Sequence, residues 1–348
     1  MASIRNVAIL GLGNQGRHHA TAALQLLRSR KIKHLVLCDT DIRRLRMYAD
    51  LENVTLESDP YQVIRSGECQ AFVIAVPNYL HEDLTLEVLK QGGHVLKEKP
   101  LAISLDSAYR MDVVAGDSGS YLEVAQQRFY HPGFAAIAHA MPRLGTLRFV
   151  DYHFSLFDDR LSWYWSKKDG GGAWLGLGWH ICNVLCSLFG SPKEIRVRFF
   201  SGKETAWYYD TEDSVIGEIT FGALIARLSA SVVGMTKRES LFLEGTTGSL
   251  SLDREQLCFS AGRLRIVERE FGSFDWSTAY CSQLEDFLLR ASRGSVGVSN
   301  LGLMTMSVLE AGRKSAETAG ERIEIVDAGP QLTFSPLRSN GALFHERR

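Results

Sequence analysis

The stretch NVAILGLGNQGRHHATAALQLLR, residues 6–28, decides the fold of the first half of the chain. It opens with a short strand-like apolar run and continues at once into a turn that holds Gly11, Gly13 and Gly16 in the spacing GxGxxG. The remaining residues have the apolar periodicity of a helix. A strand, a glycine turn and a helix in this order are the context in which the pattern binds a dinucleotide. A glycine-rich turn without a ligand is the simpler alternative.

Each glycine of this turn has a separate physical role in such a site. Gly11 allows the chain to turn tightly after the strand, Gly13 lets the backbone approach a pyrophosphate, and Gly16 lets the helix pack closely against the strand. The start of the helix also offers free N–H groups, which attract phosphate oxygens. We therefore expect a Rossmann unit, in which parallel strands alternate with helices.

The second expected strand, HLVLCD, ends at Asp39. An acidic residue at this place accepts hydrogen bonds from the adenosine ribose and repels a 2′-phosphate. The sequence therefore favours NAD over NADP as the cofactor. Arg43 and Arg44 follow closely and would partly offset this preference, although a solvent-exposed helix face explains them as well.

Two later strands end in polar residues at the edge of the sheet where ligands bind in open α/β folds. AFVIAV, residues 71–76, precedes PNYLH, and HVLK, residues 94–97, precedes Glu98, Lys99 and Pro100. A lysine at this edge can donate a proton to a carbonyl oxygen during hydride transfer. A surface lysine paired with Glu98 is an equally good interpretation of this triplet alone.

The composition limits the classes of function. The chain has 348 residues, of which 45% are hydrophobic, and this length favours two domains. Its 39 Lys and Arg residues nearly balance 40 Asp and Glu residues, so the charge does not point to nucleic acid or to an anionic membrane. No secretory signal or membrane-spanning run is recognisable, and the six cysteines form no CxxC pair. We therefore expect a cytoplasmic protein with free thiols.

A second glycine segment, GGGAWLGLGWHICN, occupies residues 170–183. Together with GLGNQG, AVPNYLH and HVLKEKPLA, which precede it in this order, it resembles the Gfo/Idh/MocA family, whose members include glucose–fructose oxidoreductase and inositol dehydrogenase. The resemblance covers roughly residues 4–326, because it continues through QQRFYHPGF (126–134), TED (211–213), LFLEGTTGSLSLD (241–253) and LEAGRKSAETAGERIEI (309–325).

The resemblance implies an α/β protein with an NAD(P)-binding Rossmann domain at residues 1–127 and a substrate-binding and oligomerisation domain at residues 128–326. The second domain is implied to contain a large, open, mostly antiparallel sheet, and residues 327–348 form an extension outside the resemblance. The substrate is implied to be a sugar, a cyclitol or a related small molecule bound between the domains. A homodimer or homotetramer assembled through the second sheet is also implied.

In this resemblance the catalytic lysine falls on Lys99 and the histidine on His180, whose imidazole we expect within a few ångströms of the lysine ammonium group. The Lys99–Pro100 bond is expected to be cis. The expected cofactor-binding residues are Gly11, Gly13, Asn14, Gln15, Gly16, Asp39, Val76, Pro77, Asn78, His81, Glu98, Lys99, Pro100 and Gln127.

The second glycine segment departs from the family pattern at two positions. Related proteins usually carry an aspartate four residues before the histidine, and commonly another three residues after it, where this chain has Gly176 and Asn183. Three interpretations remain open: the lysine and the histidine act alone, a carboxylate comes from Asp158 or Asp159 in the preceding loop, or the chain is a cofactor-binding sensor without catalysis. The absent side chain at Gly176 also predicts room for a bulkier substrate.

The residues expected to face the substrate are Asp158, Trp163, Gly176 and Asn183. Other aromatic residues of this region can stack on a sugar, but core packing is the better explanation for most of them. His180, Cys182 and Cys186 do not share one helix face and lack a fourth ligand, so we expect no metal site.

Overall fold

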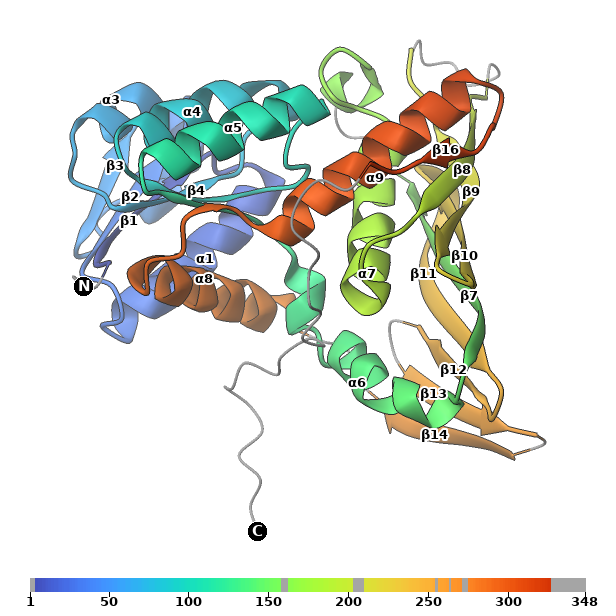
Figure 1. The fold of residues 1–348 in the computed structure, drawn as a ribbon. Helices are drawn as coiled ribbons and strands as arrows, with labels where there is room; N and C mark the ends of the chain where they lie inside the picture. The colour runs from blue at the N-terminus through green and yellow to red at the C-terminus, as the bar shows by residue number, and fades with distance from the viewer. Residues whose placement is uncertain are drawn as a thin grey trace. The chain divides into compact units, whose positions relative to one another are not determined.

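The computed structural model describes residues 4–157, 162–202, 210–253, 256–262, 264–270 and 275–326. They divide into two compact units. The first contains the chain up to residue 130 together with residues 168–170 and 275–306, and the second contains the other described residues. Each unit is built on one large sheet (Figure 1).

The sheet of the first unit is parallel throughout and has the strand order β15-β6-β5-β4-β1-β2-β3. Its inner strands are short apolar runs buried on both faces, as expected for a parallel sheet covered by helices. The strands are β1 (Asn6–Leu10), β2 (His34–Cys38), β3 (Val54–Glu57), β4 (Ala71–Ile74), β5 (His94–Lys97), β6 (Tyr121–Val124) and β15 (Gly297–Val298). This is the Rossmann-type arrangement that the first glycine turn predicts.

Helices cover both faces of this sheet (Figure 1). The helices α3 (Pro60–Arg65), α4 (His81–Lys90) and α5 (Leu105–Asp117) lie on one face, and α1 (Asn14–Arg28) and α8 (Trp276–Ser292) lie on the other. A short helix, α2 (Ile42–Leu45), follows β2. The carboxyl ends of the strands are level, because Leu10 is in register with both Cys38 and Ile74, and Ile74 is in register with Lys97.

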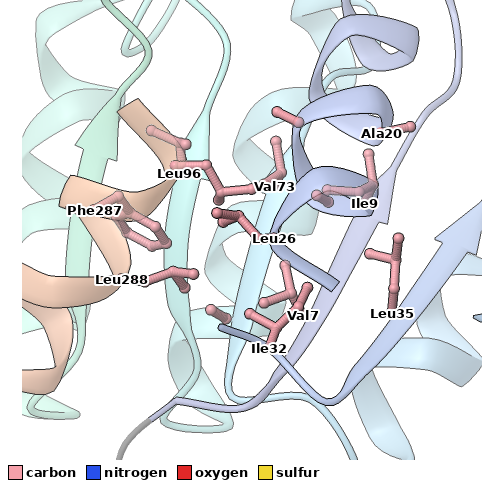
Figure 2. Packing of buried hydrophobic residues seen from close by; sticks show 14 of the residues in the cluster. Val7, Ile9, Ala20, Leu26, Ile32, Leu35, Val73, Leu96, Phe287 and Leu288 are labelled. Carbon is pink, nitrogen blue, oxygen red and sulfur yellow. The ribbon is translucent and has the colours of Figure 1, made fainter. Parts of the chain in front are cut away.

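The helix α8 belongs to the first unit although it comes from the far end of the sequence. Its Leu284 and Phe287 are fully buried in the same apolar cluster as Leu26 of α1 and Leu96 of β5. Figure 2 shows Phe287 and Leu288 on the side of the sheet where α1 packs. The first unit therefore includes more of the chain than the residues before the expected boundary at 127. Residues 275–306 belong to it as well, because α8 buries its apolar face against this sheet.

The second unit contains a nine-stranded sheet over its described residues, in the order β14-β13-β12-β11-β7-β10-β9-β8-β16. Neighbouring strands are antiparallel except for β7 and β10, which are parallel, so the predicted mostly antiparallel sheet is confirmed. The strands are β7 (Leu147–Phe157), β8 (Glu194–Phe200), β9 (Ser214–Phe221), β10 (Leu224–Ser231), β11 (Val233–Gly245), β12 (Ser249–Leu252), β13 (Gln256–Ala261), β14 (Leu264–Glu270) and β16 (Ile323–Glu324).

Alternate residues of the long strands face a helical layer. In β7, Val150, Tyr152 and Phe154 are buried, whereas the residues between them are partly exposed. The layer contains α6 (Pro132–Ala140), α7 (Trp179–Phe189) and the end of α9 (Asn300–Glu317), which begins in the first unit. Among the described helices, none is both long enough and apolar enough to cross a membrane.

Candidate active site

The glycine turn after β1 has the close contacts that its three glycines predict. Gly11 has a φ of +92°, and a Cβ atom there would lie 2.5 Å from the carbonyl oxygen of Ala75. A Cβ atom on Gly16 would overlap the carbonyl oxygen of Gly11. At Gly13, by contrast, the nearest atom to an added Cβ is an Arg44 nitrogen at 3.8 Å. The turn is therefore closed toward the protein and open at Gly13, where a ligand's phosphates would approach.

The first turn of α1 is suited to bind an anion. The helix starts at Asn14 with Gly13 as its N-cap, and no described side chain caps it. Its first turn contains no acidic residue, and the Asn14 and Gln15 side chains are exposed. Uncapped N–H groups and the helix dipole favour a phosphate at this position. The turn and the helix start therefore fit the pyrophosphate of a dinucleotide.

Asp39 follows β2 at the same edge and is almost fully buried. Its carboxylate accepts hydrogen bonds from the backbone N–H of Leu12 at 2.7 Å and of Asp41 at 2.8 Å. The guanidinium of Arg44 lies 3.1 Å from the same carboxylate and is half-exposed. Asp39 thus links the glycine turn to the end of β2, and a nitrogen of Arg44 lies 3.8 Å from where a Cβ atom on Gly13 would be.

Glu98 follows β5 and is buried within a hydrogen-bonded group. Its Oε1 atom lies 2.9 Å from Nε2 of His19 and accepts a hydrogen bond from Nε2 of Gln127 at 3.1 Å. Burial acts to raise the pKa of Glu98, but hydrogen bonds from His19 and Gln127 and the charge of Lys99 hold it below its ordinary value. Glu98 is therefore an anion at neutral pH, with its side chain fixed in direction.

His19 is a site residue that the sequence analysis missed. It lies on α1, is fully buried and contacts Glu98 from the helix that begins at the glycine turn. The sequence signal was present, since a histidine three residues after Gly16 interrupts the apolar face of the helix. A polar group on a buried face requires a partner, but the partner, Glu98, is 79 residues away in the chain.

Lys99 begins the loop beyond β5, and its peptide bond to Pro100 is cis, as predicted. Lys99 is partly exposed, whereas Lys97, two residues earlier, is fully buried. The Nζ atom of Lys97 donates a hydrogen bond to the carbonyl oxygen of Leu101 at 2.6 Å, which closes the loop that carries Lys99. Burial lowers the pKa of Lys97 to about 7, although Glu82 acts in the opposite direction.

The loop after β4 carries four of the expected cofactor-binding residues. Val76 and Pro77 are partly exposed. His81 is buried and its Nε2 atom lies 2.8 Å from the carbonyl oxygen of Val76, and burial lowers the pKa of His81 to about 3. The side chain of Asn78 donates to the carbonyl oxygen of Gly170 at 2.8 Å. His81 and Asn78 therefore shape this loop through internal hydrogen bonds.

Tyr280 of α8 adds a second group that sequence reasoning missed. Its hydroxyl donates a hydrogen bond to the side-chain oxygen of Gln15, and its ring stacks on His18 with centroids 5.1 Å apart. The same ring meets His19 edge-on at 4.9 Å. No local pattern links Tyr280 to the glycine turn, because 265 residues separate it from Gln15.

The second glycine segment forms a π-helical turn, Trp174–Gly178, that continues directly into α7. Small residues permit this wide turn, because the Trp174 ring occupies the space beside Gly178 and a Cβ atom there would lie 2.5 Å from it. His180 lies in the first turn of α7, is buried, and meets the ring of Phe154 edge-on at 6.0 Å. Isolated π turns occur frequently at functional sites.

The interpretation that Gly176 leaves room for a bulkier substrate is wrong. A Cβ atom on Gly176 would overlap the hydroxyl oxygen of Tyr164 and lie 2.6 Å from the adjoining ring carbon Cζ. The phenol of Tyr164 therefore fills the space that a side chain at position 176 would take. Trp163 beside it is partly exposed, and Asn183, one turn after His180, is buried.

A carboxylate lies at the second glycine segment, contributed by Glu212. Glu212 accepts a hydrogen bond from the backbone N–H of Trp174 at 2.7 Å, and a Cβ atom on Gly172 would overlap it. Burial raises the pKa of Glu212, although hydrogen bonds from Trp174 and Thr211 act against that shift. Glu212 thus holds the start of the helical segment. Asp158 and Asp159 lie outside the described residues.

The cysteines of this region are buried thiols. Cys182 and Cys186 are fully buried on α7, and burial raises the pKa of both. All six cysteines are free of disulfide bonds. Within the described ranges, no three His, Cys, Asp or Glu side chains gather in a way that would hold a metal ion.

These features define a class of protein. The parallel sheet, its glycine turn and the acidic residue after β2 are those of a dinucleotide-binding unit, and a second unit built on a large antiparallel sheet accompanies it. The chain belongs to the GFO/IDH/MocA oxidoreductase family, because residues 5–126 match the family's NAD-binding Rossmann fold and residues 140–251 match its C-terminal domain.

Two relatives illustrate the similarity in sequence. The chain is 28% identical over 156 residues to the uncharacterized oxidoreductase YdgJ of Escherichia coli strain K12, and this covers 44% of the chain and 45% of YdgJ. It is 22% identical over 265 residues to the scyllo-inositol 2-dehydrogenase (NADP(+)) IolW of Bacillus subtilis strain 168, which covers 74% of the chain and 72% of IolW. The chain thus spans about half the length of YdgJ and nearly three quarters of IolW.

Solved structures share the whole fold. Levoglucosan dehydrogenase in complex with NADH has a TM-score of 0.82 at 17% identity, covering 94% of this chain and 100% of that chain. An oxidoreductase domain protein from Kribbella flavida has a TM-score of 0.79 at 22% identity, covering 93% of this chain and 100% of that chain. At these identities the likeness establishes the fold alone.

Proposed function

We propose that the chain is an NAD(P)-dependent dehydrogenase or reductase that acts on a hydroxyl or carbonyl group of a sugar, a cyclitol or a related small molecule. The observation that carries the proposal is the set of groups at the carboxyl edge of the first sheet. The open glycine turn after β1, the buried Asp39 after β2, and Glu98 with Lys99 after β5 follow strands whose ends are level. Their types and places suit a dinucleotide and a proton-transferring lysine.

We propose that different residues of the first unit bind different parts of the cofactor. The N–H groups at the start of α1 would hold the pyrophosphate, and Asp39 would accept hydrogen bonds from the adenosine ribose. Glu98, held by His19 and Gln127, would present a fixed anion near the reacting end. His81 and Asn78 would act through the shape of the loop after β4, because their side chains are already bonded within the unit.

Lys99 is proposed as the group that moves the proton. A bound nicotinamide would supply or accept the hydride. In the oxidation direction the uncharged amine of Lys99 takes the proton of the substrate hydroxyl, and in the reduction direction its ammonium group donates a proton to the carbonyl oxygen. His180 is proposed as the second polar group that acts on the substrate.

We propose NAD as the preferred cofactor. The support is the carboxylate of Asp39, which is fixed by two backbone N–H groups and would repel a 2′-phosphate. Arg44 acts against this preference, since its half-exposed guanidinium lies beside the same carboxylate and would attract a 2′-phosphate. A homodimer or homotetramer that uses the second sheet is proposed as the assembly, because β10 and β9 carry the exposed apolar residues Ile225 and Ile216.

The second candidate function is a cofactor-binding sensor without catalysis. The observation in its favour is that a phenol, rather than a carboxylate, fills the side-chain space at Gly176. Such a protein would keep the dinucleotide site and bind a small molecule without turning it over.

One experiment separates the two functions. Purified protein is incubated with NAD and, separately, with NADP and a panel of sugars and cyclitols, and formation of the reduced cofactor is followed by absorbance. Turnover that falls about 100-fold or more in Lys99→Ala, while calorimetric NAD binding is retained, supports the dehydrogenase. Saturable binding of a panel compound without turnover, equal in the wild type and Lys99→Ala, supports the sensor.

A further inference from the structure

The side-chain space at Gly176 contains a specific chemical group. The hydroxyl oxygen of Tyr164 lies where a Cβ atom on Gly176 would be, and both residues are buried within the second unit. Any side chain at position 176 would have to displace the tyrosine. The position of the Tyr164 phenol therefore explains why residue 176 is a glycine: only a residue without a side chain leaves room for the hydroxyl.

The helix geometry directs this hydroxyl toward His180. Side chains four residues apart on one helix face are neighbours, with about 5–6 Å between their Cβ atoms. Gly176 lies four residues before His180, in the π-helical turn Trp174–Gly178 that continues directly into α7. The Tyr164 oxygen, which takes the Cβ position of residue 176, is therefore within reach of the His180 imidazole.

Tyr164 is held firmly enough to act as a fixed group. Its carbonyl oxygen accepts a hydrogen bond from the backbone N–H of Gly172 at 2.9 Å, and a Cβ atom on Gly171 would overlap that oxygen. Its ring is met edge-on by Trp163 at 5.7 Å and by Trp165 at 6.3 Å. Backbone and ring are thus both fixed, which limits the directions that the hydroxyl can take.

We propose that Tyr164 is a positioning residue for His180. Its hydroxyl orients the imidazole with an uncharged hydrogen bond, from the place where a side chain at position 176 would otherwise stand. A phenol can donate or accept a hydrogen bond but carries no charge at neutral pH, so His180 meets the substrate without a neighbouring anion at this position. The inference rests on the proposed function for its role in turnover, whereas the proposed hydrogen bond between Tyr164 and His180 can be tested without it.

The contact is tested by NMR on the full chain with isotope-labelled histidine, in the absence and presence of NAD. The His180 ring signals are assigned by their loss in His180→Gln. Tyr164→Phe keeps the ring that fills the gap and removes the hydroxyl alone, and it is expected to shift the His180 ring signals and change their pH titration. Tyr164→Ala combined with Gly176→Asp places a carboxylate there, and it is expected to move the His180 titration midpoint to higher pH by about one unit or more.

Tyr121→Phe is the matched control. It removes a buried phenol whose hydroxyl bonds to Glu123 at 2.9 Å, at the amino end of β6 in the first unit. The control is expected to leave the His180 signals in place. Unchanged His180 signals and titration in Tyr164→Phe, in a variant that unfolds at the wild-type temperature, would overturn the proposal, because the tyrosine would then only fill space.

Kinetics test the role in turnover once a substrate is found. Tyr164→Phe is expected to lower kcat about 10-fold with little change in KM, and the Tyr164→Ala, Gly176→Asp double variant to recover part of that loss. Equal kcat in Tyr164→Phe and the wild type would remove the functional part of the inference. Absence of turnover with every substrate contradicts the proposed function instead, and the NMR result then still decides whether Tyr164 orients His180.

Discussion

The Oε1 atom of Glu98 lies 2.9 Å from the Nε2 atom of His19, and both side chains are buried. This contact joins α1, which begins at the glycine turn, to the loop that carries Lys99. It places a negative charge on a defined side chain at the carboxyl edge of the sheet. The pKa of Glu98 stays below its ordinary value in spite of burial because His19 and Gln127 donate to the carboxylate.

Replacing His19 by leucine is expected to destabilise the protein by about 1–3 kcal/mol at neutral pH, because a buried carboxylate then loses a hydrogen-bond partner. A folded-state pKa that is lowered contributes stability above the unfolded pKa and loses it as pH falls through the folded value. The stability difference between the wild type and His19→Leu should therefore be largest near pH 7 and shrink as the pH falls and Glu98 becomes protonated, which the lowered pKa of Glu98 delays to a pH below the ordinary range of a glutamate. Urea unfolding across this pH range measures it, and a difference that grows toward low pH would contradict the expectation.

Replacing Asp39 by alanine is expected to narrow the difference in affinity between NAD(H) and NADP(H). The variant loses the acceptor for the ribose and the repulsion of a 2′-phosphate, and it removes one of the two carboxylates that lie beside Arg44. Calorimetric titration with both cofactors measures the change. Asp41→Ala is the control, since Asp41 also contacts Arg44 but bonds to Arg43, whereas Asp39 bonds to the glycine turn at Leu12. Tighter binding of NADP(H) than of NAD(H) by the wild type would contradict the proposed preference.

Replacing Gly16 by alanine is expected to weaken cofactor binding at least 10-fold and to destabilise the protein by about 1–3 kcal/mol, because the new methyl group overlaps the Gly11 carbonyl oxygen. Gly116→Ala in α5 is the matched control. An added Cβ meets nothing within 4 Å there, and alanine favours a helix by up to about 1 kcal/mol over glycine. Thermal unfolding with and without NAD gives both quantities. Equal NAD affinities in the two variants would show that the glycine turn does not hold the cofactor.

Replacing Lys97 by methionine is expected to make stability less dependent on pH in the alkaline range. The folded-state pKa of Lys97 is lowered to about 7, so between about pH 7 and pH 10 the unfolded chain binds a proton that the folded chain does not. The wild type therefore gains stability as pH rises through this range, and Lys97→Met lacks that gain.

Between about pH 7 and pH 10, the unfolding free energy of the wild type should rise relative to that of Lys97→Met by an amount on the order of a few kcal/mol. The lost hydrogen bond to Leu101 lowers the stability of the variant at every pH and leaves the slope unaffected. Denaturant unfolding at pH 7, 8.5 and 10 measures the slope, with Lys90→Met on the surface of α4 as control. Parallel stability curves for the wild type and Lys97→Met would contradict a buried lysine that changes its charge.

Local sequence determined the elements that hold the cofactor site in the first unit. The run before Gly11 is typical of a short buried strand, and the spacing of the three glycines predicts a tight turn into a helix. Asp39 directly follows β2, and Lys99 lies two residues after the end of β5. Parallel strands place their carboxyl ends at one edge, so these residues were predictable as neighbours without coordinates. The family pattern likewise predicted the mostly antiparallel second sheet.

Only the tertiary structure decided which side chains contact the residues of the two glycine segments and of the loop after β5. His19 meets Glu98 across 79 residues and Tyr280 meets Gln15 across 265, and no periodicity within one segment records such pairs. The glycine at position 176 suggested an empty space beside the helix. In the folded chain the phenol of Tyr164, from the preceding segment, fills that space. The physical reason is that strand and helix patterns depend on residues that are close together in the chain. A packing space is filled, and a buried charge is paired, by side chains that folding brings together from distant parts of the sequence.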